Sequence, residues 1–416
     1  MKLAKLSLLA VLALAAPLAA GCSSGDVSSS PVATDDDNEI VDVKHTDVER
    51  QSIGNCWIYA HATWVESMHL SATGESFDTS QSYWTYWHWF DQVAGGFSSE
   101  ISTGGNWSTA NNIIRKYGMM AEKDFVPADL ANEMSARQKT ALDTMNASLK
   151  TGALKDSASR RDKKLLRKEM DRAWGLTPEV SAMLDKAFGE SATRTFASRT
   201  PATAAGTPIL RGEDFKVAYA SGPGTAPQQK TLSQAMTEWR EAFYSASTQR
   251  PFLLRVQNAL HAAQPVIISW FVDFSALENR DNERKGSFSL TTLKEFGSGH
   301  QGGHETVLED YQAKLPDGTV LKAGKTLDPK NAADAALLRS ALDPRTEIQF
   351  LRIKNSWGGA RPDRAFAPGM PGYHDLYLDY LNGPVKKCVE KDGQTDTSNC
   401  PSDVTPLQSI VLPPGF

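Results

Sequence analysis

Three short segments, far apart in the chain, contain side chains that could act together in nucleophilic catalysis. The first supplies a thiol at Cys56, the second an imidazole at His304 and the third an amide at Asn355. A thiol becomes a strong nucleophile when it loses its proton, which a nearby imidazole can accept, and an amide can hold that imidazole in one orientation. The segments are 51–57 (Gln-Ser-Ile-Gly-Asn-Cys-Trp), 303–307 (Gly-His-Glu-Thr-Val) and 354–358 (Lys-Asn-Ser-Trp-Gly). Together they predict a Cys–His–Asn catalytic site.

The first segment contains further features that would support such a thiol. Apolar residues recur at helical spacing from Cys56 to His69, so Cys56 is expected in the first turn of a helix with Asn55 as its N-cap. A helix N-terminus favours the charged thiolate. The side-chain amide of Gln51 and the backbone N–H of Cys56 are candidates for stabilising the oxyanion of a tetrahedral intermediate.

The elements that must position these residues change in character along the chain. Helical periodicity is typical of residues 41–125 and continues through 126–260, which we interpret as a helical insertion. Apolar, β-branched runs follow in 261–385, the longest of them at 265–272. Helices first and strands later predict an α+β protein with two unlike subdomains, followed by a C-terminal extension at 386–416.

Residues 77–90 are unusually rich in aromatic side chains. Such a cluster could stack on a ligand. Because the aromatic positions cover several faces of a helix, we predict instead a buried helix that packs beside the first one. The residues concerned are Tyr83, Trp84, Tyr86, Trp87 and Trp89.

The N-terminus has the pattern of an export signal. A basic start is followed by an apolar run over 6–20, too short for a lasting membrane span, and then by Cys22. The residues that end at Cys22 resemble the lipobox of bacterial lipoproteins, in which the cysteine is acylated and becomes the first residue. The alternative is an ordinary secretory signal that is cleaved nearby. We predict a signal peptide at 1–21, lipidation of Cys22 and a flexible tether over 22–40.

Composition limits the partners and the location. The formal net charge of −5 provides no excess of cations for phosphate, which argues against nucleic acid as a partner. The eight histidines lack the spacing of metal ligands, so neither a metal nor another cofactor is predicted.

An exported lipoprotein would lie in the bacterial cell envelope, anchored to the outer membrane through Cys22. In that oxidising compartment, Cys388 and Cys400 are expected to form a disulfide rather than two free thiols. The oligomeric state stays open.

The order of the reactive residues resembles that of the papain-like cysteine peptidases. Cys56 followed by Trp at the start of a helix matches the nucleophile segment of that family. His304 at the start of a strand, and Asn355 followed by Ser-Trp357-Gly, resemble its histidine and asparagine segments. The resemblance implies a papain-like fold, hydrolysis of peptide or protein substrates, and a Trp357 side chain that shields the His–Asn pair from water.

Two further segments resemble the bleomycin-hydrolase and aminopeptidase branch of that family. Residues 77–87 are similar to its Phe-Glu-Leu-Ser-Gln-x-Tyr helix, and residues 104–118 to its Gly-Gly-x-Trp…Lys-Tyr-Gly stretch. In papain-like enzymes the Gly-Gly segment lines the substrate cleft. The resemblance therefore implies that Gly104 and Gly105, together with Trp357, belong to the substrate-binding region.

Four features depart from the family pattern, one of which is that the disulfide cysteine usually found just before the nucleophile is absent. Gln51 lies five residues before Cys56, where the family usually has six. The histidine and the asparagine are further apart than usual, which implies an inserted excursion over 315–345. The chain also continues beyond Tyr380, whereas the C-terminus of the aminopeptidase branch occupies the cleft. Two alternatives therefore stand beside the peptidase: an inactive papain-like binding or scaffolding lipoprotein, and an acyltransferase or transglutaminase-type enzyme with the same triad.

Overall fold

The computed structural model describes residues 43–416 except 326 and 392. The predicted signal peptide, the lipidation site at Cys22 and the tether over 22–40 lie outside the described residues. None of the helices in the described part of the chain is both long and apolar enough to cross a membrane.

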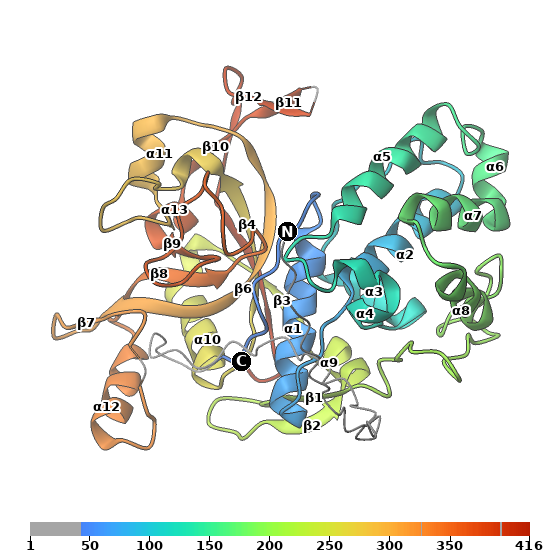
Figure 1. Cartoon of the computed structure of the whole chain (residues 1–416). Helices are drawn as coiled ribbons and strands as arrows, with labels where there is room; N and C mark the ends of the chain where they lie inside the picture. The colour runs from blue at the N-terminus through green and yellow to red at the C-terminus, as the bar shows by residue number, and fades with distance from the viewer. Residues whose placement is uncertain (1–42, 326, 392) are drawn as a thin grey trace, which may run out of the picture.

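One half of the molecule consists of helices gathered around α1 (Cys56–Thr73). Figure 1 shows α1 between the main sheet on one side and the other helices on the opposite side, which explains why most of its residues are buried. The remaining helices of this half are α2 (Gln81–Ala94), α3 (Trp107–Tyr117), α4 (Glu122–Phe125), α5 (Ala136–Lys150), α6 (Ser157–Arg161), α7 (Lys163–Trp174) and α8 (Pro178–Phe188), with the 3-10 helix η1 (Pro127–Asp129).

Helix α2 confirms the prediction that the aromatic side chains of residues 77–90 form core. All five predicted aromatic residues of this helix are at most 1% exposed. Trp87 stacks on Tyr117 of α3, with 4.1 Å between the ring centroids. The Tyr83 hydroxyl donates a hydrogen bond to the Tyr117 carbonyl, 2.6 Å away. Burial of these large rings stabilises the contact between α2 and its neighbours, although Nε1 of Trp87 and of Trp89 has no hydrogen-bond partner among the described residues.

The other half contains one large sheet with the strand order β3-β14-β4-β6-β8-β9-β5, to which β7 is attached through β6. Its strand pairs are antiparallel except for β5 and β9, which run parallel. The strands are β3 (Arg240–Phe243), β4 (Ile267–Asp273), β5 (Ser287–Phe288), β6 (Gln301–Lys314), β7 (Val320–Leu321), β8 (Glu347–Lys354), β9 (Tyr373–Tyr377) and β14 (Leu407–Leu412).

Shorter elements connect and cover the two halves. A small hairpin and a helix lie around the lower end of α1 in Figure 1: β1 (Lys216–Tyr219), β2 (Gln228–Thr231) and α9 (Leu232–Glu238). The helical elements of the sheet half are η2 (Ala246–Thr248), α10 (Gln249–His261), η3 (Phe274–Ala276), α11 (Leu290–Phe296), α12 (Ala332–Ala341) and α13 (Leu378–Asn382). Two further strand pairs lie near the C-terminus: β10 (Val385–Lys387) with β13 (Ser402–Val404), and β11 (Val389–Lys391) with β12 (Gln394–Asp396).

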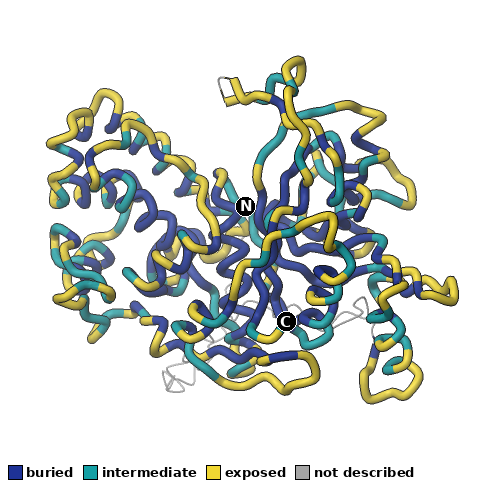
Figure 2. The backbone as a smooth tube through the Cα atoms, turned by 180° about the vertical axis from the view of Figure 1, so that it is seen from behind, coloured by how far each residue is buried: buried dark blue, intermediate teal, exposed yellow. Residues whose placement is uncertain are grey.

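This arrangement is the α+β class that the sequence predicts, with a helical half and a half built on an antiparallel sheet. Figure 2 shows that the buried backbone runs through the centre of the molecule and that exposed loops lie at its periphery. The excursion expected over 315–345 consists of β7, α12 and the loops around them.

Two predicted segments are organised differently from the expectation. Residues 126–260 are not purely helical, because β3 forms one edge of the main sheet. The C-terminal extension 386–416 is not a separate appendage, because β14 lies inside the sheet between β3 and β4. Pairing across the sheet outweighs the helical periodicity near β3, since β14 supplies partners for its backbone hydrogen bonds.

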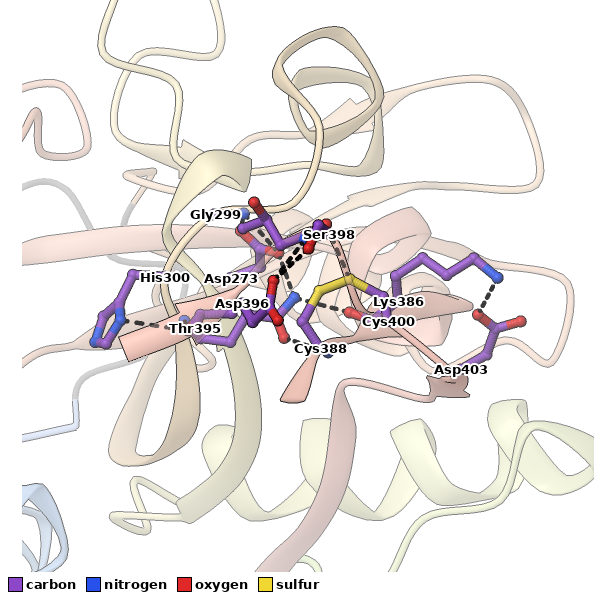
Figure 3. The surroundings of a disulfide bond; sticks show 12 residues. Asp273, Gly299, His300, Lys386, Cys388, Thr395, Asp396, Ser398, Cys400 and Asp403 are labelled. Carbon is purple, nitrogen blue, oxygen red and sulfur yellow. Dashed lines mark hydrogen bonds and ion pairs between the residues drawn. A yellow bond between two sulfur atoms is a disulfide. The ribbon is translucent and has the colours of Figure 1, made fainter. Parts of the chain in front are cut away.

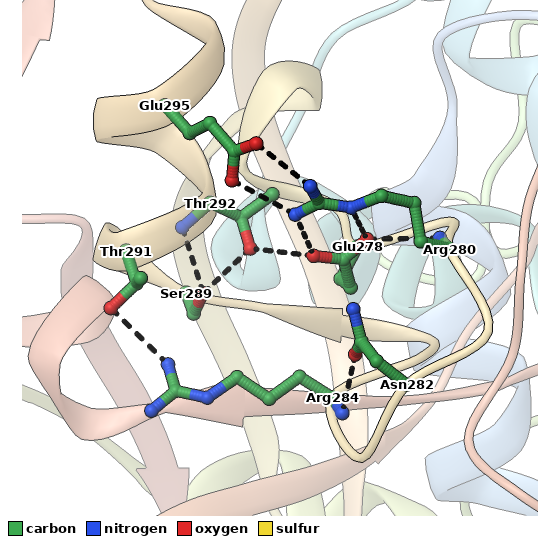
Figure 4. Close-up of polar contacts among 8 residues, drawn as sticks. All are labelled: Glu278, Arg280, Asn282, Arg284, Ser289, Thr291, Thr292 and Glu295. Carbon is green, nitrogen blue, oxygen red and sulfur yellow. Dashed lines mark hydrogen bonds and ion pairs between the residues drawn. The ribbon is translucent and has the colours of Figure 1, made fainter.

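The loop before β5 is held by a charged cluster and a close backbone contact. Arg280 donates hydrogen bonds to Glu278, at 2.6 Å, and to Glu295 of α11, at 2.7 Å (Figure 4). Gly286 follows with φ +78°, and a Cβ at this position would lie 2.0 Å from the backbone carbonyl carbon of Phe366. The loop before β5 can therefore approach the segment around Phe366 only with glycine at position 286.

We expect Gly286→Ala to destabilise the protein much more than Gly74→Ala. Gly74 follows α1 with a similar φ of +75° and the left-handed helical conformation, and no atom lies within 4 Å of the added Cβ, so its replacement costs only backbone strain, about 1 kcal/mol. Gly286→Ala adds a steric clash with backbone and should cost about 3 kcal/mol or more. Urea denaturation of both variants checks this, and equal losses would contradict the proposed close contact.

Candidate active site

Cys56 is the first residue of α1 and is buried, as a free cysteine. Asn55 directly precedes the helix, as predicted, but its side chain does not cap it. The Asn55 amide instead donates hydrogen bonds to Thr85 of α2, at 3.1 Å, and to Gln138 of α5, at 3.0 Å. The side chain therefore joins three helices immediately behind the thiol, and the predicted capping role is wrong.

The surroundings of the thiol act on its pKa in opposite directions. Burial raises the pKa of Cys56 to about 12, and the carboxylate of Glu305 contributes to the rise. Backbone hydrogen bonds at Glu305, Trp57 and Cys56 itself lower the pKa, as expected where a sulfur lies at the N-terminus of a helix. Burial prevails, so Cys56 is a neutral thiol. The hydrogen bond at Glu305 also places the sulfur beside the residue that follows His304.

His304 and Asn355 are joined by a direct hydrogen bond. His304 lies near the start of β6, and Asn355 directly follows β8, the neighbouring antiparallel strand. His304 Nε2 and Asn355 Oδ1 are 2.8 Å apart, and the backbone N–H of Ser356 donates to the same oxygen, also at 2.8 Å. Because a backbone N–H can only donate, the shared atom must be the amide oxygen. His304 Nε2 is therefore the donor, and Nδ1 is the nitrogen that can act as a base.

Trp357 covers the imidazole. Its ring stacks on His304 with 4.8 Å between the centroids and an interplanar angle of 17°, and Trp357 itself is buried. The Arg364 guanidinium lies 4.2 Å from the Trp357 centroid. Burial lowers the pKa of His304 to about 4, the hydrogen bond with Asn355 opposes this shift, and Arg364 adds to it. The imidazole is therefore neutral, like the thiol, whereas the sequence led us to expect a thiolate beside an imidazolium.

Gln51 links the first and third segments. Its side-chain Nε2 donates to the Ile53 carbonyl at 2.8 Å, and its Oε1 accepts a hydrogen bond from the Ser356 hydroxyl at 2.6 Å. The Gln51 backbone N–H also donates to the Ser356 carbonyl, at 2.9 Å. These contacts hold Gln51 beside Asn355. Both ends of its side-chain amide are hydrogen-bonded within the protein and do not point into an open oxyanion site.

Gly104 and Gly105 are exposed; the Gly104 carbonyl lies 3.2 Å from His88 Nε2 of α2, and Gly105 lies against the start of α1. Trp57, the residue after the thiol, donates a hydrogen bond from Nε1 to the Thr103 carbonyl at 2.9 Å. A Cβ on Gly105 would lie 2.4 Å from the Trp57 ring, so this close packing requires glycine. The Gly-Gly backbone is thus accessible beside the residue that follows Cys56.

The C-terminal segment reaches the start of β6. Cys388 and Cys400 form a disulfide, as predicted, and the loop between them lies beside Asp273, Gly299 and His300 (Figure 3). Gln301, three residues before His304, donates to the Lys386 carbonyl at 2.8 Å and accepts from the Cys388 backbone N–H at 2.9 Å. The disulfide-closed loop is therefore attached to the strand that carries His304.

Two polar residues that sequence reasoning missed lie next to the triad candidates. Glu305 is 8% exposed and accepts a hydrogen bond from the Ser269 hydroxyl at 3.0 Å, and burial raises its pKa to about 7. His374, in β9, lies 3.2 Å from the amide nitrogen of Asn355. The sequence offered only a weak signal for each: Glu305 directly follows His304, and His374 follows a Gly-Tyr pair at 372–373.

Comparison with known proteins gives similar solved structures but no sequence relatives. No protein-family description matches this chain, and no curated protein sequence matches it. Among solved structures, PepW from Lactobacillus rhamnosis HN001 is similar over 92% of this chain and 82% of its own, with 12% identity and a TM-score of 0.44. Xylellain, a cysteine protease from Xylella fastidiosa, is similar over 91% and 86%, with 13% identity and a TM-score of 0.33. The clostridial cysteine protease Cwp84 is similar over 89% of this chain and 56% of its own, with 11% identity and a TM-score of 0.33. At such low similarity, function must be argued from the geometry of the site.

We expect Glu305→Gln to increase the reactivity of Cys56 above about pH 7, the pKa of the Glu305 carboxyl. Above that pH the carboxylate opposes formation of the thiolate, and glutamine removes its charge while it retains an acceptor for Ser269. The rate of alkylation by iodoacetamide, measured at Cys56 by peptide mapping, should therefore diverge from that of the native protein as the pH rises.

The matched control for this prediction is Glu347→Gln, which removes a carboxylate from an exposed position of β8. It should leave the alkylation rate unchanged.

In the native protein the alkylation rate of Cys56 should rise continuously between about pH 5 and pH 9, because the thiol is neutral over this range. A rate that is constant over this range would instead indicate a preformed thiolate.

Proposed function

We propose that this protein is a thiol-dependent peptidase of the papain-like kind, with Cys56, His304 and Asn355 as its catalytic triad. The main support is the hydrogen bond of 2.8 Å between His304 Nε2 and Asn355 Oδ1, which leaves Nδ1 free as a base. The thiol lies at a helix N-terminus and contacts the backbone of Glu305, the residue next to that histidine.

The neutral resting pair suits a mechanism in which the proton moves as the thiol attacks. The Cys56 sulfur would form a bond to the peptide carbonyl carbon while its proton passes to His304 Nδ1. The tetrahedral intermediate would collapse to a thioester as the C–N bond breaks and His304 returns the proton to the leaving amine. Water would then attack the thioester, releasing a carboxylic acid product and restoring the thiol.

The oxyanion requires donors that the protein holds in place. The backbone N–H of Cys56 is one candidate, since this residue opens α1. Gln51 is the other candidate, although its Nε2 donates to the Ile53 carbonyl, so it would contribute through its remaining N–H or after a side-chain movement. The exposed backbone of Gly104 and Gly105 would pair with an extended peptide substrate, and Trp357 would exclude water behind the imidazole.

The branch and the location are further parts of this proposal. The similarity of residues 77–87 and 104–118 to the bleomycin-hydrolase and aminopeptidase branch supports placing the protein there. The sequence of residues 1–22 supports export and a lipid anchor at Cys22 in the bacterial cell envelope. The disulfide between Cys388 and Cys400 is consistent with an oxidising compartment.

Replacing either reacting group should abolish peptidase activity. Cys56→Ser and His304→Ala are each expected to lower kcat/KM on a peptide library by at least about 1000-fold, because the nucleophile and its base act as a unit. His300→Ala, which removes a histidine from outside the proposed triad, should retain activity.

The acid limb of kcat/KM should lie near pH 4, the pKa of His304, because the base works only while it is unprotonated.

Cys22→Ala should release the protein from the membrane fraction without changing its activity. Acylation of this cysteine would supply the anchor, and residues 23–42 separate it from the described fold. Fractionation of expressing cells, together with incorporation of labelled palmitate, checks the prediction. Equal membrane association and no label in the native protein would exclude the lipoprotein proposal and leave the peptidase proposal intact.

The second candidate is a binding or scaffolding lipoprotein that keeps the fold without catalysis. The observation in its favour is that the Gln51 amide is engaged by Ile53 and Ser356 instead of an open site. An inert Cys56 and no hydrolysis by the native protein would favour it. If peptides are crosslinked or aminated instead of hydrolysed, the acyltransferase alternative with the same triad is correct.

A further inference from the structure

Asn355 has a second histidine as a partner. His374 in β9 is fully buried, and its Nδ1 lies 3.2 Å from Asn355 Nδ2. An amide nitrogen only donates, so His374 Nδ1 must accept this hydrogen bond and carry its proton on Nε2. The order of contacts is therefore His304, Asn355 and His374, with the amide between two imidazoles.

The surroundings of His374 are largely aromatic. The rings of Trp357 and Phe366 each lie 5.3 Å from the imidazole, centroid to centroid, and Phe288 lies at 5.8 Å. Burial lowers the pKa of His374 to about 3, and the charge of Arg364, together with that of His304 when it is protonated, adds to this shift. The imidazole therefore stays neutral and able to accept a hydrogen bond at Nδ1.

His374 is also an unfavourable residue for the fold alone. Its Nε2 is buried without a hydrogen-bond partner among the described residues, although the backbone of Ala365 acts on its pKa in the raising direction. A buried polar atom without a partner lowers stability. An apolar side chain would remove this unpaired atom, but it would also take away the acceptor of the buried Asn355 amide, so the contact with Asn355 is the reason we see for a histidine here.

The orientation of the Asn355 amide determines which nitrogen of His304 carries the proton. With Oδ1 toward His304, Nε2 is the donor and Nδ1 can take a proton from the thiol. If the amide were turned over, Nδ2 would face His304, so Nε2 would have to accept and Nδ1 would carry the proton. That tautomer of His304 cannot act as a base toward Cys56.

We propose that His374 is a positioning residue that holds the Asn355 amide with Oδ1 toward His304 and so keeps His304 in the tautomer with a free Nδ1. The Ser356 N–H acts in the same direction from the backbone. With the amide turned over, Oδ1 would face Nδ1 of His374, so either the two acceptors would repel each other or the His374 proton would have to leave Nε2 for Nδ1. This inference rests on the proposed function, since it concerns the same catalytic base.

The test compares His374→Leu with His374→Asn in the full chain. Leucine removes the acceptor, whereas the asparagine oxygen can replace Nδ1 as a partner of the Asn355 amide. His374→Leu is expected to lower kcat/KM by about tenfold or more through kcat, with KM unchanged. Its thermal midpoint should stay close to that of the native protein, because the loss of the unpaired His374 Nε2 offsets the newly unpaired Asn355 Nδ2. His374→Asn should recover most of the activity.

A direct measurement of the tautomer separates this inference from the proposed function. The ¹⁵N chemical shifts of His304 should indicate one tautomer, protonated at Nε2, in the native protein and in His374→Asn, and a mixture in His374→Leu. This measurement needs no substrate, so it still decides the positioning role if the native protein proves to have no peptidase activity.

A double-mutant cycle adds a control for an effect through folding. In an Asn355→Ala background, His374→Leu should change the residual activity less than twofold, because the residue on which it acts is absent. Unchanged kcat and ¹⁵N shifts in His374→Leu would overturn the proposal. If His374→Leu loses activity only because its lower thermal midpoint leaves less folded protein, the proposal is overturned as well.

Discussion

The pairing of β6 with its two neighbours is the constraint on which the rest of the site depends. β6 pairs antiparallel with β4 and β8, and this register sets Trp270 opposite His304 and Lys354 opposite Val307. Asn355, the residue after Lys354, therefore reaches the imidazole from the end of the neighbouring strand. The same strand packs against α1, so the backbone beside His304 meets the thiol at the start of that helix. A slip of one residue in this register would turn His304 to the opposite face of the sheet.

Burial, more than any single charge, sets the chemistry of the candidate site. Water is largely excluded from Cys56, His304 and Asn355, and this exclusion favours the neutral forms of the thiol and the imidazole. The helix N-terminus stabilises a thiolate in the expected direction, but the desolvation of a charged sulfur is the larger effect. Stacking on Trp357 maintains this dry environment on the side of the imidazole. The site is thus suited to concerted proton transfer.

The C-terminal residues are part of the sheet half and not an addition to it. β14 lies inside the main sheet, next to β4, which in turn supports β6. The disulfide-closed loop before β14 is bound to Gln301 at the start of β6. This contact lies three residues from His304 in the sequence.

The sequence by itself determined the identity of the reactive groups and the local elements that carry them. The periodicity after Cys56, the aromatic helix and the strands around His304 and before Asn355 follow from side-chain spacing, which is a local property. Only the tertiary structure decided the partners. Pairing between distant strands placed β3 and β14 in one sheet, joined Gln51 to Ser356 and set His374 behind Asn355. The protonation states likewise depend on burial by residues far away in the chain, because desolvation is a property of the assembled core and not of any segment in it.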